Sequence, residues 1–220
     1  MHYGEVTARG RLVREENVAP ALAALPGEAI KTTIGLTLQR YIDSLWQASA
    51  PGVRGSMVAL TPTGEVLALY SAPGYDPNAF VGGISTEEWR RLNDDPARPL
   101  LDRAIQTRYP PASPFKLATA AMALKRGIAT FSTHMPEPCR GGLQVGNRYF
   151  RCWKPEGHGN LDLEGAIAKS CDVYFYQLGL RIGLDAILSD GVLMGFRERS
   201  GIDLENEIAP IYPSNAAYFD

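Results

Sequence analysis

The stretch Tyr109–Lys116, YPPASPFK, is the starting point for predicting the fold of this chain. An almost wholly apolar run, residues 117–124, follows it, and Gly127 stands where such a run would stop. We therefore predict a helix with Ser113 as its N-cap and Pro114 in the first helical position, ending before Gly127. Because this helix has almost no polar face, we expect it to lie buried in the middle of a domain.

Lys116 follows Ser113 by three residues, and no other lysine of the chain has a serine at that distance before it. One helical turn would bring the Lys116 amine beside the Ser113 hydroxyl. This S-x-x-K spacing is typical of serine enzymes that transfer acyl groups, in which a desolvated lysine can take the serine proton. The motif is short, and a capping serine followed by a surface lysine is the alternative interpretation.

The amino-acid composition excludes several classes of function. The 220 residues are 45% hydrophobic and 21% charged, with a net charge of −2, so no basic excess indicates nucleic acid. No apolar run is long enough to span a bilayer, and the first residues do not resemble a signal peptide. Three cysteines, an odd number, exclude a fully paired disulfide framework within one chain.

The first half of the chain predicts a mixed fold. Residues 1–31 form a separate piece that is partly strand-like, and residues 34–48 carry apolar side chains at helical spacing. Two apolar segments, 55–60 and 65–70, flank the turn sequence TPTG and predict a hairpin. A helix followed by antiparallel strands indicates an α+β domain whose helices pack on an antiparallel sheet.

The second half is more irregular in its signals. Residues 71–108 are loop-rich, and a long connection inside a domain is often functional. Residues 131–159 are also expected to be irregular. Helices are predicted over residues 162–169 and 172–182, with Gly183 ending the second, whereas no strong element is predicted for the last forty residues.

A second candidate group is the segment Ser170-Cys171-Asp172. A serine and a short polar side chain at the start of a helix could pass protons and hold an amide. The alternative is an N-cap without further function. We expect the tryptophans Trp46, Trp89 and Trp153 to pack rather than to bind carbohydrate.

Cys139, Cys152, His158 and Cys171 include every cysteine of the chain. Three thiolates and an imidazole make a closed tetrahedral set for structural zinc, and the surrounding loop has little apolar content with which to fold. The glycines on either side of His158 would let it turn inward. Two alternatives stay open, namely a Cys139–Cys152 disulfide with Cys171 buried and free, and unlinked residues with a core histidine.

In the order and number of its motifs, the chain resembles the transpeptidase domain of class B penicillin-binding proteins, nearest to the elongation-type branch, penicillin-binding protein 2. The likeness covers nearly the whole chain. It rests on ARGR at 8–11, GEVLA at 64–68, YDPNAF at 75–80, PLLDRA at 99–104, YPP at 109–111, GHG at 157–159, SCD at 170–172 and GIDL at 201–204.

The resemblance implies a serine acyl-transfer mechanism that needs no catalytic cofactor. Ser113 would attack the penultimate D-alanine carbonyl of a peptidoglycan stem peptide, and Lys116 would activate it. Ser170 would relay a proton to the leaving group, and Asp172 would stand where many relatives carry asparagine. An amine of a neighbouring strand would then form the cross-link, and β-lactams would acylate the same serine.

The chain also departs from the family pattern. Ala112 and Pro114 replace the glycine and threonine that commonly flank the serine, and Gly35 stands where aspartate is usual. No lysine is followed by Ser/Thr-Gly, so the family's third motif is missing. We therefore expect a truncated chain, inactive by itself, with residues 1–31 ending a non-catalytic pedestal domain and residues 32–220 forming a partial transpeptidase domain.

The resemblance further implies a setting on the extracytoplasmic face of the inner membrane, with the anchor outside this chain. It implies a membrane glycosyltransferase of the elongation machinery as partner, and no nucleic acid. Two other functions remain to be weighed. One is a serine β-lactamase of the same superfamily, and the other is a catalytically incomplete scaffold or binding module.

Overall fold

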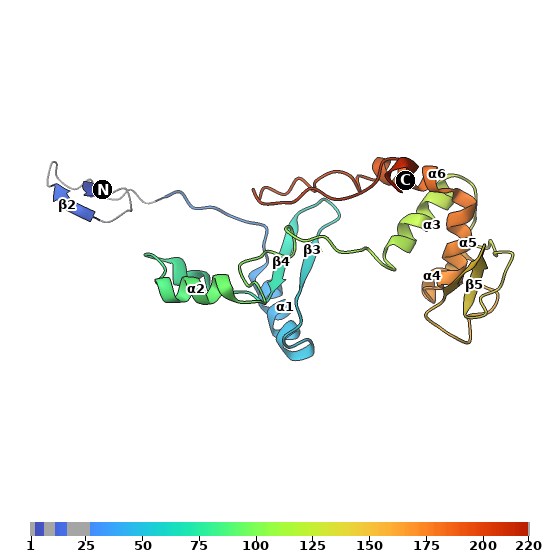
Figure 1. Ribbon diagram of the computed structural model, residues 1–220, viewed down its shortest axis with the longest axis horizontal. Helices are drawn as coiled ribbons and strands as arrows, with labels where there is room; N and C mark the ends of the chain where they lie inside the picture. Colours follow the sequence, from blue (N-terminus) through green and yellow to red (C-terminus); the bar gives the residue numbers. More distant parts are fainter. Residues whose placement is uncertain (1–2, 7–11, 17–26, 220) are drawn as a thin grey trace.

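A computed structural model describes residues 3–6, 12–16 and 27–219. Near the amino terminus, β1 (Tyr3–Val6) pairs antiparallel with β2 (Leu12–Glu16), which agrees with the strand-like pattern predicted there. The ARGR motif at 8–11 lies outside the described residues. Beyond this hairpin, Figure 1 shows two groups of elements, one around β3 and β4 and the other formed by α3 to α6 with β5.

The first group, called here the hairpin group, consists of α1 (Leu36–Ser49), β3 (Gly55–Leu60) and β4 (Val66–Ala72). The predicted hairpin is confirmed, with Val58 opposite Leu69 in an antiparallel register. The helix packs on β4, and the buried side chains between them belong to Ile42, Ala68, Tyr70 and Ala72.

The first residues of α1 also complete the free edge of β4. The Gln39 amide donates to the Leu69 carbonyl at 2.6 Å and accepts from the Leu69 N–H at 3.0 Å, as a paired strand residue would. The Gly35 N–H donates to the Leu67 carbonyl at 2.8 Å. The edge of this two-stranded sheet is therefore covered, which satisfies backbone groups that a bare edge would leave open.

The loop-rich segment 71–108 holds more structure than the sequence predicts. It contains the 3-10 turn η1 (Pro77–Phe80) and the helix α2 (Thr86–Asp94), which begins where the Ser85 hydroxyl accepts the Glu88 N–H. Helix α2 is short and strongly polar, and only Leu92 among its residues is buried, so the apolar spacing that reveals a helix is missing.

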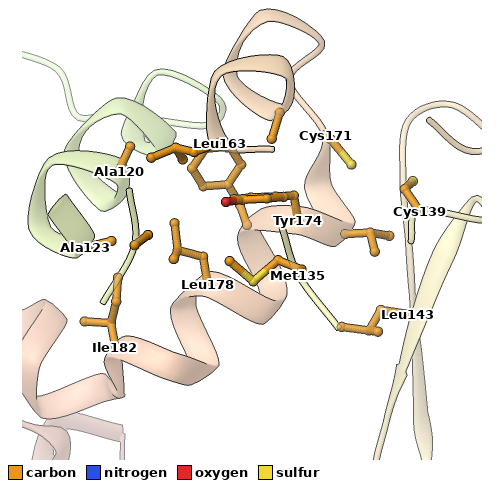
Figure 2. Packing of buried hydrophobic residues seen from close by; sticks show 14 of the residues in the cluster. Ala120, Ala123, Met135, Cys139, Leu143, Leu163, Cys171, Tyr174, Leu178 and Ile182 are labelled. Atoms are coloured by element: carbon orange, nitrogen blue, oxygen red, sulfur yellow. The ribbon is translucent and has the colours of Figure 1, made fainter. Parts of the chain in front are cut away.

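The second group, called here the helical group, contains α3 (Phe115–Lys125), α4 (Leu163–Ala168), α5 (Asp172–Ile182) and α6 (Leu184–Leu193). The predicted helices over 162–169 and 172–182 are confirmed. Leu117 on one face of α3 is 59% exposed, but the buried position expected for this helix holds for the other face, where Met122 and Ala123 have no exposed surface. Figure 2 shows their neighbours in this core, among them Leu178, Leu163 and Tyr174.

The sequence predicts that residues 131–159 are irregular, but the structure shows two strands in this segment. These four-residue strands, β5 (Gly142–Val145) and β6 (Arg148–Arg151), form an antiparallel hairpin in which Leu143 is buried. Each strand carries only two large apolar side chains, too few for an alternating pattern to indicate a strand. The prediction of no strong element in the last forty residues is also wrong, because α6 lies there. The sequence does not indicate this helix because Ser189, Asp190 and Gly191 interrupt its apolar residues.

The architecture is α+β, as predicted, and the sheets of the described residues are three separate antiparallel pairs. After α6 the chain runs without helix or strand until the turn η2 (Ala216–Phe219). Tyr212 fixes this segment to α6, where its hydroxyl donates to the Ile187 carbonyl at 2.9 Å. Among the helices described, none combines the length and the apolar character required to cross a bilayer.

Candidate active site

Ser113 lies in the turn that leads into α3, but it is not the N-cap. That position belongs to Pro114, whose backbone is already helical at φ −54° and ψ −29°. The N–H groups of Phe115 and Lys116 donate to the carbonyls of Ala112 and Ser113, which makes a tighter first turn. The predicted helix start is thus displaced by one residue, and the exposed Ser113 hydroxyl contacts the lysine.

The backbone before the serine is strained. Ala112 has φ +49°, in the left-handed region that an L-residue enters at a cost of roughly 1–2 kcal/mol. Glycine enters this region freely, which gives a physical reason for the glycine commonly found at this position in the family. The turn nevertheless places the Ser113 hydroxyl at the start of α3, where the helix dipole favours developing negative charge.

Lys116 joins the two halves of the site. Its Nζ lies 3.3 Å from Ser113 Oγ, 3.0 Å from Ser170 Oγ, 2.9 Å from the Ser170 carbonyl oxygen and 2.5 Å from Asp172 Oδ1. The Lys116 side chain is 16% exposed and the Asp172 side chain 22%, so this ion pair is largely shielded from water. The structure therefore brings together all four residues that the sequence predicts as catalytic, across a separation of more than fifty positions.

Ser170 and Asp172 are presented by the connection between α4 and α5. Ser170 has φ +48°, a second non-glycine residue in the left-handed region, and Asp172 is the first residue of α5. A carboxylate in the first turn of a helix interacts favourably with the helix dipole. The strained backbone at Ser170 turns its hydroxyl and its carbonyl toward the same lysine.

Cys139, Cys152, His158 and Cys171 converge directly behind this connection. Their candidate ligand atoms all lie within 4.8 Å of one another, and no disulfide joins the three cysteines. His158 Nδ1 lies 3.6 Å from Cys139 Sγ and 3.5 Å from Cys152 Sγ. Usual Zn–S and Zn–N bond lengths at tetrahedral angles place a sulfur and a nitrogen about 3.6 Å apart. The four side chains therefore fit a tetrahedral metal ion.

Glycines allow the chain to close around this cluster. His158 stands between Gly157 at φ +81° and Gly159 at φ +76°, so the inward turn predicted from the sequence is borne out by the backbone. A Cβ on Gly157 would lie 2.1 Å from the Cys139 carbonyl oxygen. Cys139 and Gly159 exchange two backbone hydrogen bonds of 2.9 Å, which locks the two ends of the loop together.

Burial and mutual contacts shift the pKa values of the side chains in the cluster. Burial, and then the neighbouring thiols, raise the pKa of the Cys171 thiol to about 12. Burial acts in the same direction on Cys139, but N–H groups of Gly141 and His158 outweigh it, and the pKa of Cys139 is lowered. Burial also lowers the pKa of His158, which favours the neutral imidazole that ligates metals. Three adjacent thiols ionise together only when a cation compensates their charge.

Trp153 belongs to the site, although the sequence predicts only packing for it. Its backbone N–H donates to Asp172 Oδ2 at 3.0 Å, and its indole Nε1 donates to the carbonyls of Lys169 and Ser170, both at 3.1 Å. The one signal in the sequence is its position, immediately after the predicted metal ligand Cys152. Its hydrogen bonds connect the cluster to the segment that holds Lys116.

Two cavities flank the site. One of about 670 Å³ borders Ser170 and is lined by Trp153, Lys169 and residues 154–156. The other, of about 810 Å³, lies between residues 104–111 and the segment that follows α6. The second is the larger, yet it is lined by Tyr109 to Pro111 rather than by the four clustered side chains, so the chemistry is located by the contacts of Lys116 and not by cavity size.

Comparison with known proteins places these observations in one family. Residues 55–218 match the penicillin-binding protein transpeptidase domain. The peptidoglycan D,D-transpeptidase MrdA of Haemophilus influenzae is 40% identical over 211 residues, which are 96% of this chain and 31% of that protein. The chain thus spans about a third of the length of this curated relative.

Solved structures agree. Penicillin-binding protein A from M. tuberculosis, as its penicillin G acyl-enzyme complex, is 34% identical with a TM-score of 0.69, covering 76% of this chain and 40% of the other. A chain in a structure of a peptidoglycan synthase complex that coordinates polymerization and crosslinking is 33% identical, with a TM-score of 0.78. The match covers 98% of this chain and 39% of the other. This chain belongs to the penicillin-binding protein transpeptidase domain family, and it is homologous to the MrdA and penicillin-binding protein 2 transpeptidases.

Proposed function

We propose that this chain is part of a peptidoglycan D,D-transpeptidase that acts through a serine acyl-enzyme during cell elongation. The single observation that carries the proposal is the contact of Lys116 Nζ with Ser113, Ser170 and Asp172 in a chain of this family. The named transpeptidase relatives and the penicillin G acyl-enzyme of a related domain support it.

In the proposed first step, Ser113 Oγ attacks the penultimate D-alanine carbonyl while its proton passes to Lys116. The bond to the terminal D-alanine breaks, its nitrogen gains a proton through Ser170, and the peptide stays on Ser113 as an ester. Four oxygen acceptors, from Ser113, Ser170 and Asp172, surround the Lys116 amine. Asp172 Oδ1, at 2.5 Å, is its nearest acceptor.

In the second step, an amine from a neighbouring peptidoglycan strand attacks the ester, and the cross-link forms as Ser113 regains its proton. A β-lactam would acylate Ser113 in the same way, because its ring amide presents an equivalent carbonyl. The oxyanion of each tetrahedral intermediate needs backbone donors, and the N–H of Ser113 at the beginning of α3 is one candidate.

We further propose that this chain is inactive by itself. It contains no Lys-Thr/Ser-Gly sequence, and in this family that motif forms another wall of the site. Residues 1–31 are assigned to the end of a pedestal domain and residues 32–220 to part of the transpeptidase domain. We place the full-length protein at the extracytoplasmic face of the inner membrane. We propose a membrane glycosyltransferase as its partner, which the related peptidoglycan synthase complex supports.

For the metal cluster we propose structural zinc held by Cys139, Cys152, His158 and Cys171. Four protein ligands leave no open position for water, so the metal would organise rather than catalyse. Cys171 lies between Ser170 and Asp172, and the bound ion would therefore tie the 139–159 loop to the segment that contacts Lys116.

The proposed nucleophile is tested by labelling the full-length gene product with a fluorescent penicillin. Ser113→Ala is expected to abolish covalent labelling, because the proposed nucleophile is removed. Ser44→Ala, at an exposed position on α1, is the matched control and should label like the parent. Labelling that persists in Ser113→Ala would remove Ser113 as the nucleophile.

The proposed metal is tested by elemental analysis of the purified protein. We expect about one zinc per chain, and loss of the metal in Cys171→Ser, because a hydroxyl is a far weaker zinc ligand than a thiolate. Chelation should also lower the melting temperature of the parent but not that of Cys171→Ser. A metal-free protein with a disulfide between Cys139 and Cys152 by mass spectrometry would refute the zinc proposal.

A further inference from the structure

Trp153 stands out because its side chain is 63% exposed, yet both of its N–H groups are engaged. Here the indole donates to two successive carbonyls, those of Lys169 and Ser170, while the ring packs edge-on against His158 at a centroid distance of 5.1 Å. The ring is thus held by the metal cluster on one side and directed at the catalytic segment on the other.

The groups that Trp153 holds are the same groups that hold Lys116. The Ser170 carbonyl accepts from the Trp153 indole at 3.1 Å and from Lys116 Nζ at 2.9 Å. The Asp172 carboxylate accepts the Trp153 backbone N–H on Oδ2 and Lys116 Nζ on Oδ1. Two of the groups that contact the lysine amine, the Ser170 carbonyl and the Asp172 carboxylate, are therefore also contacted by Trp153.

The backbone at Ser170 needs such support. Its φ of +48° is unfavourable for a residue with a side chain, and a strained conformation persists only where its surroundings hold it. Without the indole donor, the Ser170 carbonyl keeps Lys116 as its hydrogen-bond partner, and its peptide plane is held from the other side only by the Cys171 N–H, which donates to the Ala166 carbonyl at 2.9 Å. A small tilt of this peptide would move the Lys116 amine with the carbonyl and change its distance to Ser113 Oγ.

We propose that Trp153 is a positioning residue for acylation, in which the indole N–H fixes the Ser170 carbonyl and thereby keeps Lys116 between Ser113 and Asp172. The inference rests on the proposed acyl-transfer function of Ser113. It assigns Trp153 no contact with substrate, and its effect should therefore appear in the rate of the chemical step rather than in binding.

The test measures acylation of the full-length gene product by a fluorescent penicillin over time. It separates the first-order rate constant at saturation, the half-saturating concentration and the fraction labelled at completion. Trp153→Phe keeps a ring and loses the donor. We expect a rate constant lower by about tenfold, because small misplacement of a catalytic group is costly, with the other two quantities within about twofold of the parent.

Trp89→Phe is the matched control, since Trp89 is a partly exposed tryptophan on α2, and it should leave all three quantities unchanged. A sharper variant places the benzothiophene analogue of tryptophan at position 153, which preserves ring size and replaces only the N–H by sulfur. It should reproduce the slow rate at full zinc content.

Two results would overturn the inference. One is a parental rate constant in the benzothiophene variant. The other is a lower labelled fraction at an unchanged rate constant in both variants, which would make Trp153 merely structural. Neither result would affect the proposed function, whose own failure is labelling that persists in Ser113→Ala.

Discussion

The helical group and the hairpin group are built with very different depth of packing. Helices α3, α4 and α5 enclose a continuous core in which Leu163, Val173 and Leu178 have no exposed surface (Figure 2). In the hairpin group, one face of α1 covers β4, and the buried cluster consists of four residues with Trp46 and Met57 at its margin. All four proposed catalytic residues and all four proposed metal ligands belong to the helical group or to its loop.

The difference explains where a serine and a lysine can be positioned for chemistry. Lys116 and Asp172 lie in the first turns of α3 and α5, and these two helices pack against each other through the deep core. Rigid neighbours hold the backbone of both residues at the 2.5 Å contact of their side chains, and Trp153 adds a hydrogen bond to the Asp172 carboxylate from the adjoining loop. The hairpin group, with its thin core, contributes none of the proposed catalytic residues.

The largest expected effect comes from the deep core. Leu178→Ala should lower the free energy of unfolding of the helical group by about 2–5 kcal/mol, because the cavity cannot collapse among well-packed helices. Hydrogen exchange should rise in α3 and α5, while the backbone of β3 and β4 keeps its protection. Equal loss of protection in both groups would contradict the expected independence of the helical and hairpin groups, since it would show that they unfold as one cooperative unit.

A smaller effect is expected at the ion pair between α3 and α6. The Arg126 guanidinium donates to both carboxylate oxygens of Asp190, at 2.6 Å and 3.0 Å, and this hydrogen bonding holds the pKa of Asp190 below its usual value. The unfolded chain therefore binds the proton more readily than the folded chain. The stabilisation is fully present above the unfolded pKa of about 3.9 and is lost as the pH falls through the lowered folded value.

Asp190→Asn should consequently be less stable than the parent at pH 7, and should lose less stability between pH 5 and acid, as measured by urea unfolding. Glu88→Gln is the control. The pKa of Glu88 is likewise lowered by its hydrogen bond to Arg91, but that pair lies within α2 and is solvent-exposed, so its removal should change little. Equal acid sensitivity in the parent and Asp190→Asn would contradict the assignment.

The smallest effect is expected at the edge of β4. Gln39→Ala removes both hydrogen bonds to the Leu69 backbone and should cost about 1 kcal/mol, measured as faster exchange of the Leu69 amide. Gln39→Glu keeps an acceptor for the Leu69 N–H but sets a carboxylate oxygen against the Leu69 carbonyl oxygen, so its cost should be at least as large. An effect as large as that of Leu178→Ala would mean that the hairpin group depends on its edge more than on its core.

Helices α3, α4 and α5 and the β3–β4 hairpin could be predicted from the sequence because their signals are local. Glycine readily follows the last turn of a helix, so Gly127 and Gly183 predict the ends of α3 and α5. The alternation of apolar residues around TPTG predicts the confirmed hairpin. The elements that the sequence does not predict are α2, α6 and the β5–β6 pair, whose residues lack clear apolar periodicity. Their formation depends on neighbours that the local pattern does not contain.

The sequence by itself determined the residue types of the site, the S-x-x-K spacing, and the four side chains able to ligate a metal. Only the tertiary structure decided that Lys116 meets Ser170 and Asp172 across more than fifty residues, and that the three cysteines gather around His158 instead of pairing. It also gave Trp153 its contacts. The physical reason is that spacing fixes neighbours only within one turn or strand, whereas the packing of α3 against α5 fixes which distant turns meet.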